Sequence, residues 1–342
     1  MDSPVTGLHH ITLVSGNYLV NRRFYTEVLG LKQVKLSVNQ DDIFHRHVFY
    51  ANPMKTVGGT ITFFEWPYLP MGYPGLGSPH HLAYKVGSID ALAKWHAWLK
   101  SNNVRVSRPY LRDGLASVYF RDPDNTLLEI TTVAEDVEIG YLFEFFNDVT
   151  PPPKPEADML FHGFHHATPI ISDGGLTSRF LEKFLGLVAR PIIGDPAMQA
   201  GRNDSYFLKY IVHPEAEEGF VGRGSIHHIA VNVQDDEDQR KIMRRLETAF
   251  INHSGIVDRF WFKSLYFRDP DGNLMEVATE GPGYGVDEPF ERLGEKLSLP
   301  PWLERMRRDI EAKLAEVDRS NPAEWPPSYM DPPSSPETYI GS

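Results

Sequence analysis

The feature that most constrains the fold is a dipeptide, His-His, that begins four apolar runs of the chain. The four pairs are His9-His10, His80-His81, His165-His166 and His227-His228. Each is followed by a strand-like stretch, such as Ile-Thr-Leu-Val after His10. A motif that recurs along a chain is the signature of a repeated supersecondary unit. The sequence therefore predicts four copies of one module.

Constant offsets relate the modules in pairs. A shift of 147 residues places His81 on His228 and matches Tyr-Phe-Arg-Asp-Pro-Asp at 119–124 to the same six residues at 266–271. A shift of 156 residues places the first module on the third, with Leu-Gly-Leu at 29–31 on the same triplet at 185–187. The chain is therefore interpreted as a duplicated duplication.

Each module shows the same order of secondary-structure signals. The opening apolar run predicts a strand, and a helical period of apolar residues follows it, as at Ile89, Leu92 and Trp95 of the second module. Two or three short strands come next, and an Asp-Pro-Asp turn at 122–124 or 269–271 joins the last pair. The fold class is therefore predicted as α+β, with four βαβββ modules forming mixed, curved sheets.

Chain length and a proline run suggest how the modules are divided. The 342 residues are enough for about two domains. A Pro-rich run that begins at Pro151 favours an extended linker. We expect an N-terminal domain with modules one and two, a linker, a C-terminal domain with modules three and four, and a helical extension with a Pro- and Ser-rich tail, at 5–150, 151–160, 161–284 and 285–342.

Charge and cysteine content exclude several classes of protein. A formal net charge of −12 argues against a nucleic-acid or anionic-membrane partner. No stretch approaches the roughly 20 apolar residues of a membrane span, so a cytoplasmic protein is expected. The chain has no cysteine, so any metal must be held by His and carboxylate side chains. The sequence leaves open whether the chain forms a homo-oligomer.

Two glutamates stand inside otherwise apolar closing strands. Glu276 lies 48 residues after His228, and Glu129 lies 48 residues after His81. Burying an unpaired carboxylate costs on the order of several kcal/mol, so these glutamates need partners. The first and last strands of such a module can be neighbours, and each His–Glu pair can converge on one ion. Two histidines and one carboxylate leave coordination positions open, as in non-haem Fe(II) oxygenases.

The spacing alone does not select the second histidine. Adjacent strand residues face opposite ways, so one residue of each His-His pair points into the site, and we choose the second. Either His10 or His166 can complete the site of His228 and Glu276. Alternatively, His166 joins His81 and Glu129, in a second metal site or in a remnant of the duplication.

The motifs resemble the vicinal oxygen chelate superfamily. The resemblance rests on the repeated module, on His-His-Ile-Thr at 9–12, on Arg-Asp-Pro-Asp-Gly-Asn-Leu-Met-Glu at 268–276 and on Leu-Pro-Pro-Trp-Leu-Glu at 299–304. It covers nearly all of residues 5–315. More narrowly, the chain is similar to the hydroquinone-type ring-cleaving dioxygenases of that superfamily. The resemblance implies two domains of that fold, an aromatic diol substrate and O2.

The resemblance also implies the site. In the family a histidine of the first module, with a histidine and a glutamate of the fourth, holds Fe(II), and these residues map onto His10, His228 and Glu276; Mn(II) is the alternative ion. Tyr266 is expected to hydrogen-bond a substrate or oxygen atom, and Arg259 to orient it or stabilise negative charge. The positions that match the family's pocket are His9, Thr12, His227, Arg259 and Tyr266.

Two other functions are compatible with the same scaffold. A glyoxalase-like isomerase or lyase would need a fourth carboxylate ligand, for which Glu65 is the nearest candidate. A non-catalytic binding protein would use the apolar concavities without a metal, and the complete triads argue against it. The relatives usually lack His-His in module two and the second histidine of module three, which keeps the group of His81, Glu129 and His166 as an open alternative.

Overall fold

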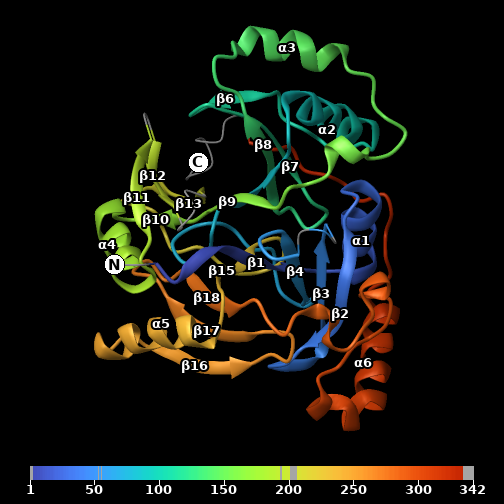
Figure 1. Ribbon diagram of the computed structural model, residues 1–342. Coiled ribbons are helices and arrows are strands. Elements are labelled where there is room, and N and C mark those ends of the chain that lie inside the picture. Colours follow the sequence, from blue (N-terminus) through green and yellow to red (C-terminus); the bar gives the residue numbers. More distant parts are fainter. Residues whose placement is uncertain (1–2, 53, 55, 193–194, 201–205, 334–342) are drawn as a thin grey trace.

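The computed structural model describes residues 3–52, 54, 56–192, 195–200 and 206–333. Within them, every module forms a strand, a helix and three further strands, which confirms the predicted α+β class (Figure 1). Module one contains β1 (Val5–Ser15), α1 (Tyr18–Arg23), the π-helical turn η1 (Phe24–Val28), β2 (Lys32–Asn39), β3 (Asp42–Ala51) and β4 (Thr60–Glu65). Module two contains β5 (His81–Lys85), α2 (Ile89–Ser101), β6 (Tyr110–Arg112), β7 (Leu115–Arg121) and β8 (Leu127–Val133).

The second half of the chain repeats this order. Module three contains β9 (Phe164–Thr168), α4 (Gly174–Leu185), β11 (Val188–Ile192), β12 (Asp195–Ala200) and β13 (Tyr206–Lys209), with a short added pair, β10 (Ile170–Ile171) and β14 (Ile211–Val212). Module four contains β15 (Ile226–Val233), α5 (Asp236–Thr248), β16 (His253–Asp258), β17 (Lys263–Arg268) and β18 (Leu274–Thr279). Modules two and three are connected by α3 (Ile139–Asp148) and the 3-10 turn η2 (Ala157–Met159).

Modules that are remote in the sequence share a sheet. One eight-stranded sheet has the order β16-β17-β18-β15-β1-β4-β3-β2, and the other has the order β11-β12-β13-β9-β5-β8-β7-β6. Module one thus joins module four, and module two joins module three. The joins are antiparallel, β1 with β15 and β5 with β9, whereas each opening strand runs parallel to the last strand of its own module.

Sheet membership differs from the order of the modules along the chain, and the division into domains at 5–150 and 161–284 stays a prediction. Inside its module, each opening strand pairs on one side only, so its other edge carries unpaired backbone groups. The opening strand of a partner module covers that edge. Two modules thereby form one curled, mixed sheet, and the partner is not the neighbour in sequence. The proposed division of the chain at the linker 151–160 concerns connectivity rather than sheet membership.

Local sequence signals set the ends of the helices. Helix α5 begins after Asp235, whose side chain accepts hydrogen bonds from the backbone N–H groups of Glu237 and Asp238. Helix α4 ends at Gly186, whose φ of 70° is left-handed and favours glycine. The buried faces of the helices pack on the sheets and contribute to one core that includes residues of all four modules.

The Asp-Pro-Asp turns of modules two and four are held by their first aspartate. In module four, Asp269 Oδ1 accepts hydrogen bonds from the backbone N–H groups of Asp271, at 3.0 Å, and Asn273, at 2.8 Å. The Asn273 side chain donates to Asp269 Oδ2 at 2.9 Å. Even with these donors, burial raises the pKa of Asp269 to about 6. The turn therefore carries a carboxylate that folding makes harder to ionise.

Replacing this carboxylate should change how stability depends on pH. The pKa of Asp269 in the folded protein lies above its unfolded value of about 3.9, so its contribution is fully present below about pH 4 and is lost toward about pH 6. Relative to the wild type, Asp269→Asn should therefore gain about 2 kcal/mol of unfolding free energy between about pH 4.5 and about pH 7. Urea unfolding at both pH values measures the difference, and parallel curves would contradict the assignment.

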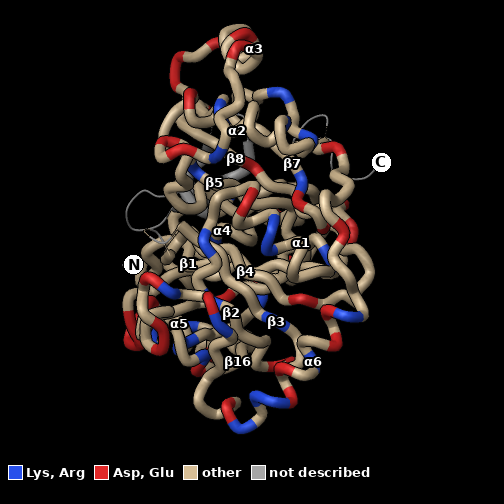
Figure 2. The backbone as a smooth tube through the Cα atoms, turned by 90° about the vertical axis from the view of Figure 1, so that its right-hand side faces the viewer, with Lys and Arg blue, Asp and Glu red and all other residues tan. Residues whose placement is uncertain are grey.

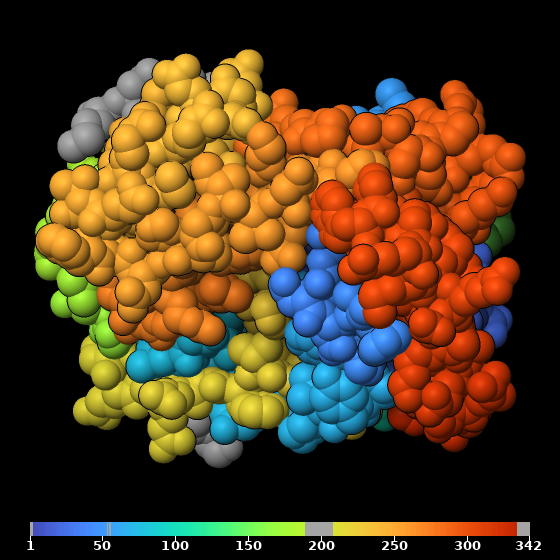
Figure 3. All heavy atoms as spheres, turned by 90° about the horizontal axis from the view of Figure 1, so that it is seen from below, coloured from blue at the N-terminus to red at the C-terminus, as the bar shows by residue number. Residues whose placement is uncertain are grey.

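The C-terminal extension lies against module one. It contains three 3-10 segments and one α-helix: η3 (Tyr284–Val286), η4 (Phe290–Arg292), η5 (Pro301–Met306) and α6 (Arg307–Ser320). Leu297 bridges to Leu36 of β2, and Arg46 of β3 forms an ion pair with Asp318 at 2.7 Å. Figure 3 shows this red segment beside the blue residues of module one.

The 3-10 turn η5 begins at Pro301, directly after Pro300, and helix α6 follows it from Arg307. The tail from Ser320 lies along the surface as far as it is described. In this part, Tyr329 is buried against Phe24. Residues 334–342 lie outside the described residues.

Charged residues of both signs are interspersed along the backbone. Figure 2 shows the positions of Lys and Arg among those of Asp and Glu along the backbone trace. None of the helices in the described part of the chain has the length and apolar character needed to span a membrane.

Candidate metal centre

Strand register brings three predicted residues to one point. His10 of β1 lies opposite Ala230 of β15, and Ala230 lies opposite Glu276 of β18. Directly opposite residues share a face of the sheet, and His228, two residues before Ala230, lies on that face as well. The small side chain of Ala230 leaves the space between His10 and Glu276 open. The three side chains therefore converge above it.

The converging atoms are close and buried. The ligand atoms of His10, His228 and Glu276 lie within 4.8 Å of one another, and all three residues are buried. Oε2 of Glu276 is 2.9 Å from Nε2 of His228 and 3.2 Å from Nε2 of His10. This oxygen has no hydrogen-bond partner. The other oxygen, Oε1, accepts a hydrogen bond from Ser264 Oγ at 2.5 Å.

These observations fit a metal ion. Burial alone would raise the pKa of Glu276, but His10 and His228 hold it well below its usual value, so the carboxylate is charged. A charged, buried oxygen without a hydrogen bond is costly unless a cation satisfies it. Two imidazole nitrogens and one carboxylate oxygen form the donor set of a site that keeps coordination positions open. The chain therefore holds its metal cofactor through His and Glu side chains.

Each ligand histidine is oriented by the histidine before it. The Nδ1 atoms of His9 and His10 are 2.8 Å apart, as are those of His227 and His228. Burial lowers the pKa of His9 and of His227 to about 3, so both are neutral near pH 7. His9 also hydrogen-bonds the backbone of Thr279. If Nε2 of His9 donates there, its Nδ1 accepts from His10, and Nε2 of His10 is left with a free lone pair.

Thr12 belongs to a short polar chain beside the ligands. It lies opposite His228, and its Oγ1 is 2.7 Å from Thr62 Oγ1. Thr62 Oγ1 is in turn 2.8 Å from Nε2 of His47. Burial lowers the pKa of His47 well below its usual value, so this ring is also neutral. Hydrogen-bonding groups thus run from β1 across β4 to β3.

Tyr266 and Arg259 lie on the opposite side of the ligands. Tyr266 of β17 is opposite Glu276, and its ring centroid is 5.7 Å from that of His228. The Arg259 guanidinium lies 5.4 Å from the Tyr266 ring and pairs with Asp41, at 2.8 and 3.2 Å. Burial raises the pKa of Tyr266, so its hydroxyl keeps its proton. This ion pair joins the β16–β17 loop to the β2–β3 hairpin.

The ligand group opens into a small cavity of about 30 Å³. Four aromatic side chains line it in addition to Tyr266, namely Phe49, Phe64, Trp261 and Phe262. Arg259 and Asp41 also line it, and the Asp41 side chain is 73% exposed, which places the pair at the mouth. A cavity of this size holds about two waters. An aromatic ring therefore enters only when side chains at the mouth move.

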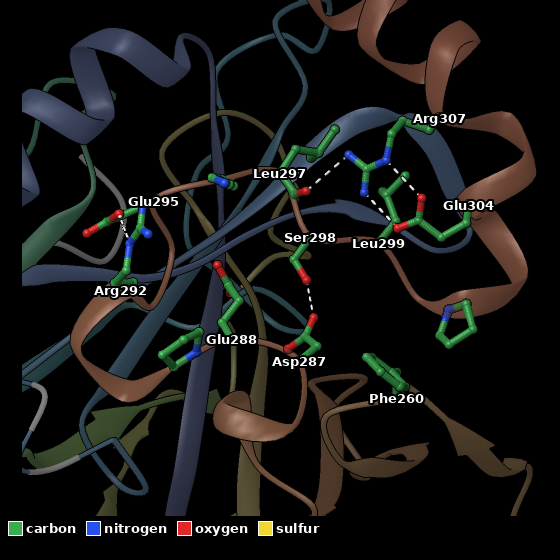
Figure 4. A pocket seen from close by; sticks show the side chains of 13 residues that line it. Phe260, Asp287, Glu288, Arg292, Glu295, Leu297, Ser298, Leu299, Glu304 and Arg307 are labelled. Atoms are coloured by element: carbon green, nitrogen blue, oxygen red, sulfur yellow. Dashed lines mark hydrogen bonds and ion pairs between the residues drawn. The ribbon is translucent and has the colours of Figure 1, made fainter.

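A larger pocket of about 470 Å³ lies on the C-terminal extension (Figure 4). Four of its charged side chains form pairs within the pocket, Arg307 with Glu304 at 2.7 Å and Arg292 with Glu295 at 2.9 Å. Asp287 and Glu288 pair instead with Lys35 of β2. None of its lining residues is a histidine, and none belongs to the metal-ligand group. Phe260 lines this pocket, and its neighbours Arg259 and Trp261 line the small cavity. The smaller cavity, which His10 and His228 line, is therefore the candidate active site.

The structure places the alternative residues elsewhere. His166 groups with His81 and Glu129 in the other sheet, so it does not complete the site of His228. Glu65 accepts a hydrogen bond from Tyr18 N at 2.9 Å through one oxygen and pairs with Arg46 at 2.7 Å through the other. Both of its oxygens are engaged away from the ligands, which argues against a fourth carboxylate ligand.

Several contributing residues were missed in the sequence. Ser264, which positions Glu276, has a counterpart in Ser117 at the module offset of 147, so comparing the modules residue by residue would have found it. His47 and Asp41 come from module one, and no repeated signal marks them. Asp41 meets Arg259 only through the pairing of module one with module four, whereas His47 reaches the site through Thr62 of its own module.

Comparisons with known proteins support the fold and its relationships. The family model of the Glyoxalase/Bleomycin resistance protein/Dioxygenase superfamily matches residues 7–130 and 145–277. A curated relative from Bacillus subtilis, named "Putative ring-cleaving dioxygenase MhqA", is 32% identical over 320 residues, which covers 92% of this chain and 99% of that protein. The chlorohydroquinone/hydroquinone 1,2-dioxygenase of Sphingobium indicum is 26% identical over 316 residues, which covers 90% and 95%.

Solved structures show the same architecture. A dioxygenase structure from Bacillus subtilis, itself described as putative, has a TM-score of 0.79 at 34% identity and covers 92% of this chain and 97% of that one. Glyoxalase I from Zea mays has a TM-score of 0.55 at 15% identity, which shows a common fold.

Proposed function

Because the chain belongs to the Glyoxalase/Bleomycin resistance protein/Dioxygenase superfamily, we propose that it is a ring-cleaving dioxygenase that opens hydroquinone- or catechol-type rings with O2. The observation that carries the proposal is the buried group of His10, His228 and Glu276 at the base of an aromatic cavity. We assign Fe(II) to it, with Mn(II) as the alternative. Bound there, the ion would supply the redox chemistry that links the diol to O2.

The side chains of the cavity would bind and orient the ring. Phe49, Phe64, Trp261 and Phe262 present apolar faces to a flat substrate and exclude water from it. Phe262 also packs on His9 and His10, with ring centroids at 5.1 and 5.3 Å. A hydroxyl of the substrate is thereby directed toward the ligand group. Negatively charged substituents have a partner in Arg259 at the mouth.

The remaining residues would hold and move protons. The Tyr266 hydroxyl, which burial keeps protonated, can donate to a substrate or oxygen atom, and Arg259 stabilises the negative charge that develops there. On the other side, His47 lines the cavity and is hydrogen-bonded through Thr62 to Thr12, so its neutral ring can orient a substrate hydroxyl. His9 and His227 keep the two ligand rings oriented.

Oxygen consumption tests the proposed function directly. The protein is reconstituted with Fe(II) without oxygen and then mixed with hydroquinone, methylhydroquinone or catechol in air-saturated buffer. One O2 should be consumed for each ring opened, both labelled atoms of ¹⁸O₂ should appear in the product, and metal-free protein should be inactive. Isomerisation of a glutathione hemithioacetal without O2 uptake would support the glyoxalase alternative. Absence of O2 uptake with every diol would refute the proposal.

A further inference from the structure

We propose that His81, Glu129 and His166 hold a second divalent transition-metal ion, so that one chain binds two ions in separate sheets. Two histidines and one carboxylate are suitable ligands for Fe(II), Mn(II), Co(II) or Zn(II). The proposal concerns metal binding alone and does not depend on the ring-cleaving activity.

The two groups have closely similar geometry. Nε2 of His81 is 3.1 Å from Glu129 Oε2, and Nε2 of His166 is 3.4 Å from the same oxygen. The corresponding distances in the first group are 2.9 and 3.2 Å. The three ligand atoms again lie within 4.8 Å of one another, and the residues are buried. The second group is therefore as compact as the first.

Strand register explains this similarity. His166 of β9 lies opposite Ala83 of β5, and Ala83 lies opposite Glu129 of β8. An alanine again stands between the histidine of one module and the glutamate of another, and it leaves the space above it open. A larger side chain at Ala83 would fill the space where the ligands converge. The repeat has kept the small residue as well as the ligands.

The supporting contacts are repeated too. Ser117 donates a hydrogen bond to Glu129 Oε1 at 2.5 Å, which leaves Oε2 to face the histidines. The Nδ1 atoms of His165 and His166 are 2.8 Å apart, as in the first site. Nε2 of His166 is buried and has no hydrogen-bond partner, although it faces the carboxylate. A buried nitrogen of this kind is satisfied by a cation between it and the oxygen.

The surroundings differ and indicate a different role. By strand pairing, Lys209 of β13 stands where Thr62 stands in the first sheet, and its Nζ lies 3.4 Å from Asp113 Oδ2. Leu115 takes the place of Phe262 at the offset of 147. The second site thus has the ammonium group of Lys209 beside it and lacks the aromatic side chain that Phe262 supplies at the first site. Its ion would connect module two to module three and stabilise the second sheet.

Metal stoichiometry tests the proposal. The full-length protein is loaded anaerobically with Mn(II), freed of loose ions by gel filtration and measured by plasma mass spectrometry. Two ions per chain are expected in the wild type, one in Glu129→Gln, one in Glu276→Gln and none in the double variant. These two substitutions are matched, because each replaces the same ligand at the same place in its sheet. One ion in the wild type and one in Glu129→Gln would overturn the proposal.

A second measurement needs no variant. Titration of the metal-free wild type with Co(II), followed by its visible absorption, should saturate at two equivalents per chain. Saturation at one equivalent would overturn the proposal even if Glu129→Gln fails to fold.

His166→Gln, checked by circular dichroism, should also bind one ion. Retention of two ions by a folded His166→Gln would likewise refute the assignment.

Discussion

Glu276→Gln is expected to empty the first metal site and to lower ring-cleaving activity by at least about 10³-fold, which corresponds to about 4 kcal/mol of activation free energy. The glutamate is the only anionic member of the group of His10, His228 and Glu276. A neutral amide lacks the charge that attracts a divalent ion and can turn its NH2 group toward the two nitrogens. Metal content and kcat/KM for hydroquinone measure the effect.

A matched control separates this loss from general damage. Glu280 lies just beyond the same strand, is exposed, and accepts a hydrogen bond from Asn232 at 2.8 Å, which a glutamine oxygen can also accept. Glu280→Gln should keep both metal and activity. If Glu276→Gln retained full metal content and turned over hydroquinone at the wild-type rate, the ligand assignment would be wrong.

The repeat in the sequence accounts for most of the fold. An identical order of strand, helix and turn signals in four copies predicts βαβββ modules, because each local signal has a local physical cause, such as the capping Asp235 or the left-handed Gly186. The partner of each module was not predictable in this way. Which modules share a sheet depends on which of the opening strands β1, β5, β9 and β15 pair with each other. All four of these strands carry the same His-His motif, so the sequence does not distinguish their partners.

Only part of the candidate site was predictable from the repeat. The separation of 48 residues predicted that His228 and Glu276 lie together, since both belong to one module. His10 came from the family resemblance, because its proximity to His228 depends on the pairing of β1 with β15. Some residues join the site only through that pairing, such as Asp41, which forms an ion pair with Arg259. The repeated motifs do not mark these residues.

Tyr266→Phe is expected to lower kcat by about 10²-fold, the usual effect of losing one positioned proton donor, and to leave metal content unchanged. The hydroxyl is not among the ligand atoms, and the phenyl ring keeps its packing on His228. Because burial raises the pKa of Tyr266, the wild-type hydroxyl stays protonated through neutral pH, so the loss should be nearly constant from about pH 6 to about pH 9. Stopped-flow O2 consumption at saturating hydroquinone measures kcat.

The duplication supplies the control for this change. Tyr119 stands opposite Glu129 as Tyr266 stands opposite Glu276, and its ring lies 5.7 Å from His81, the same distance that separates Tyr266 from His228. Tyr119→Phe removes the same atom from the same strand position in the other sheet. It should change kcat by less than about twofold, because ring cleavage occurs at the first site. Equal losses in both variants would show that the hydroxyls support the sheets and that Tyr266 donates no proton in the reaction.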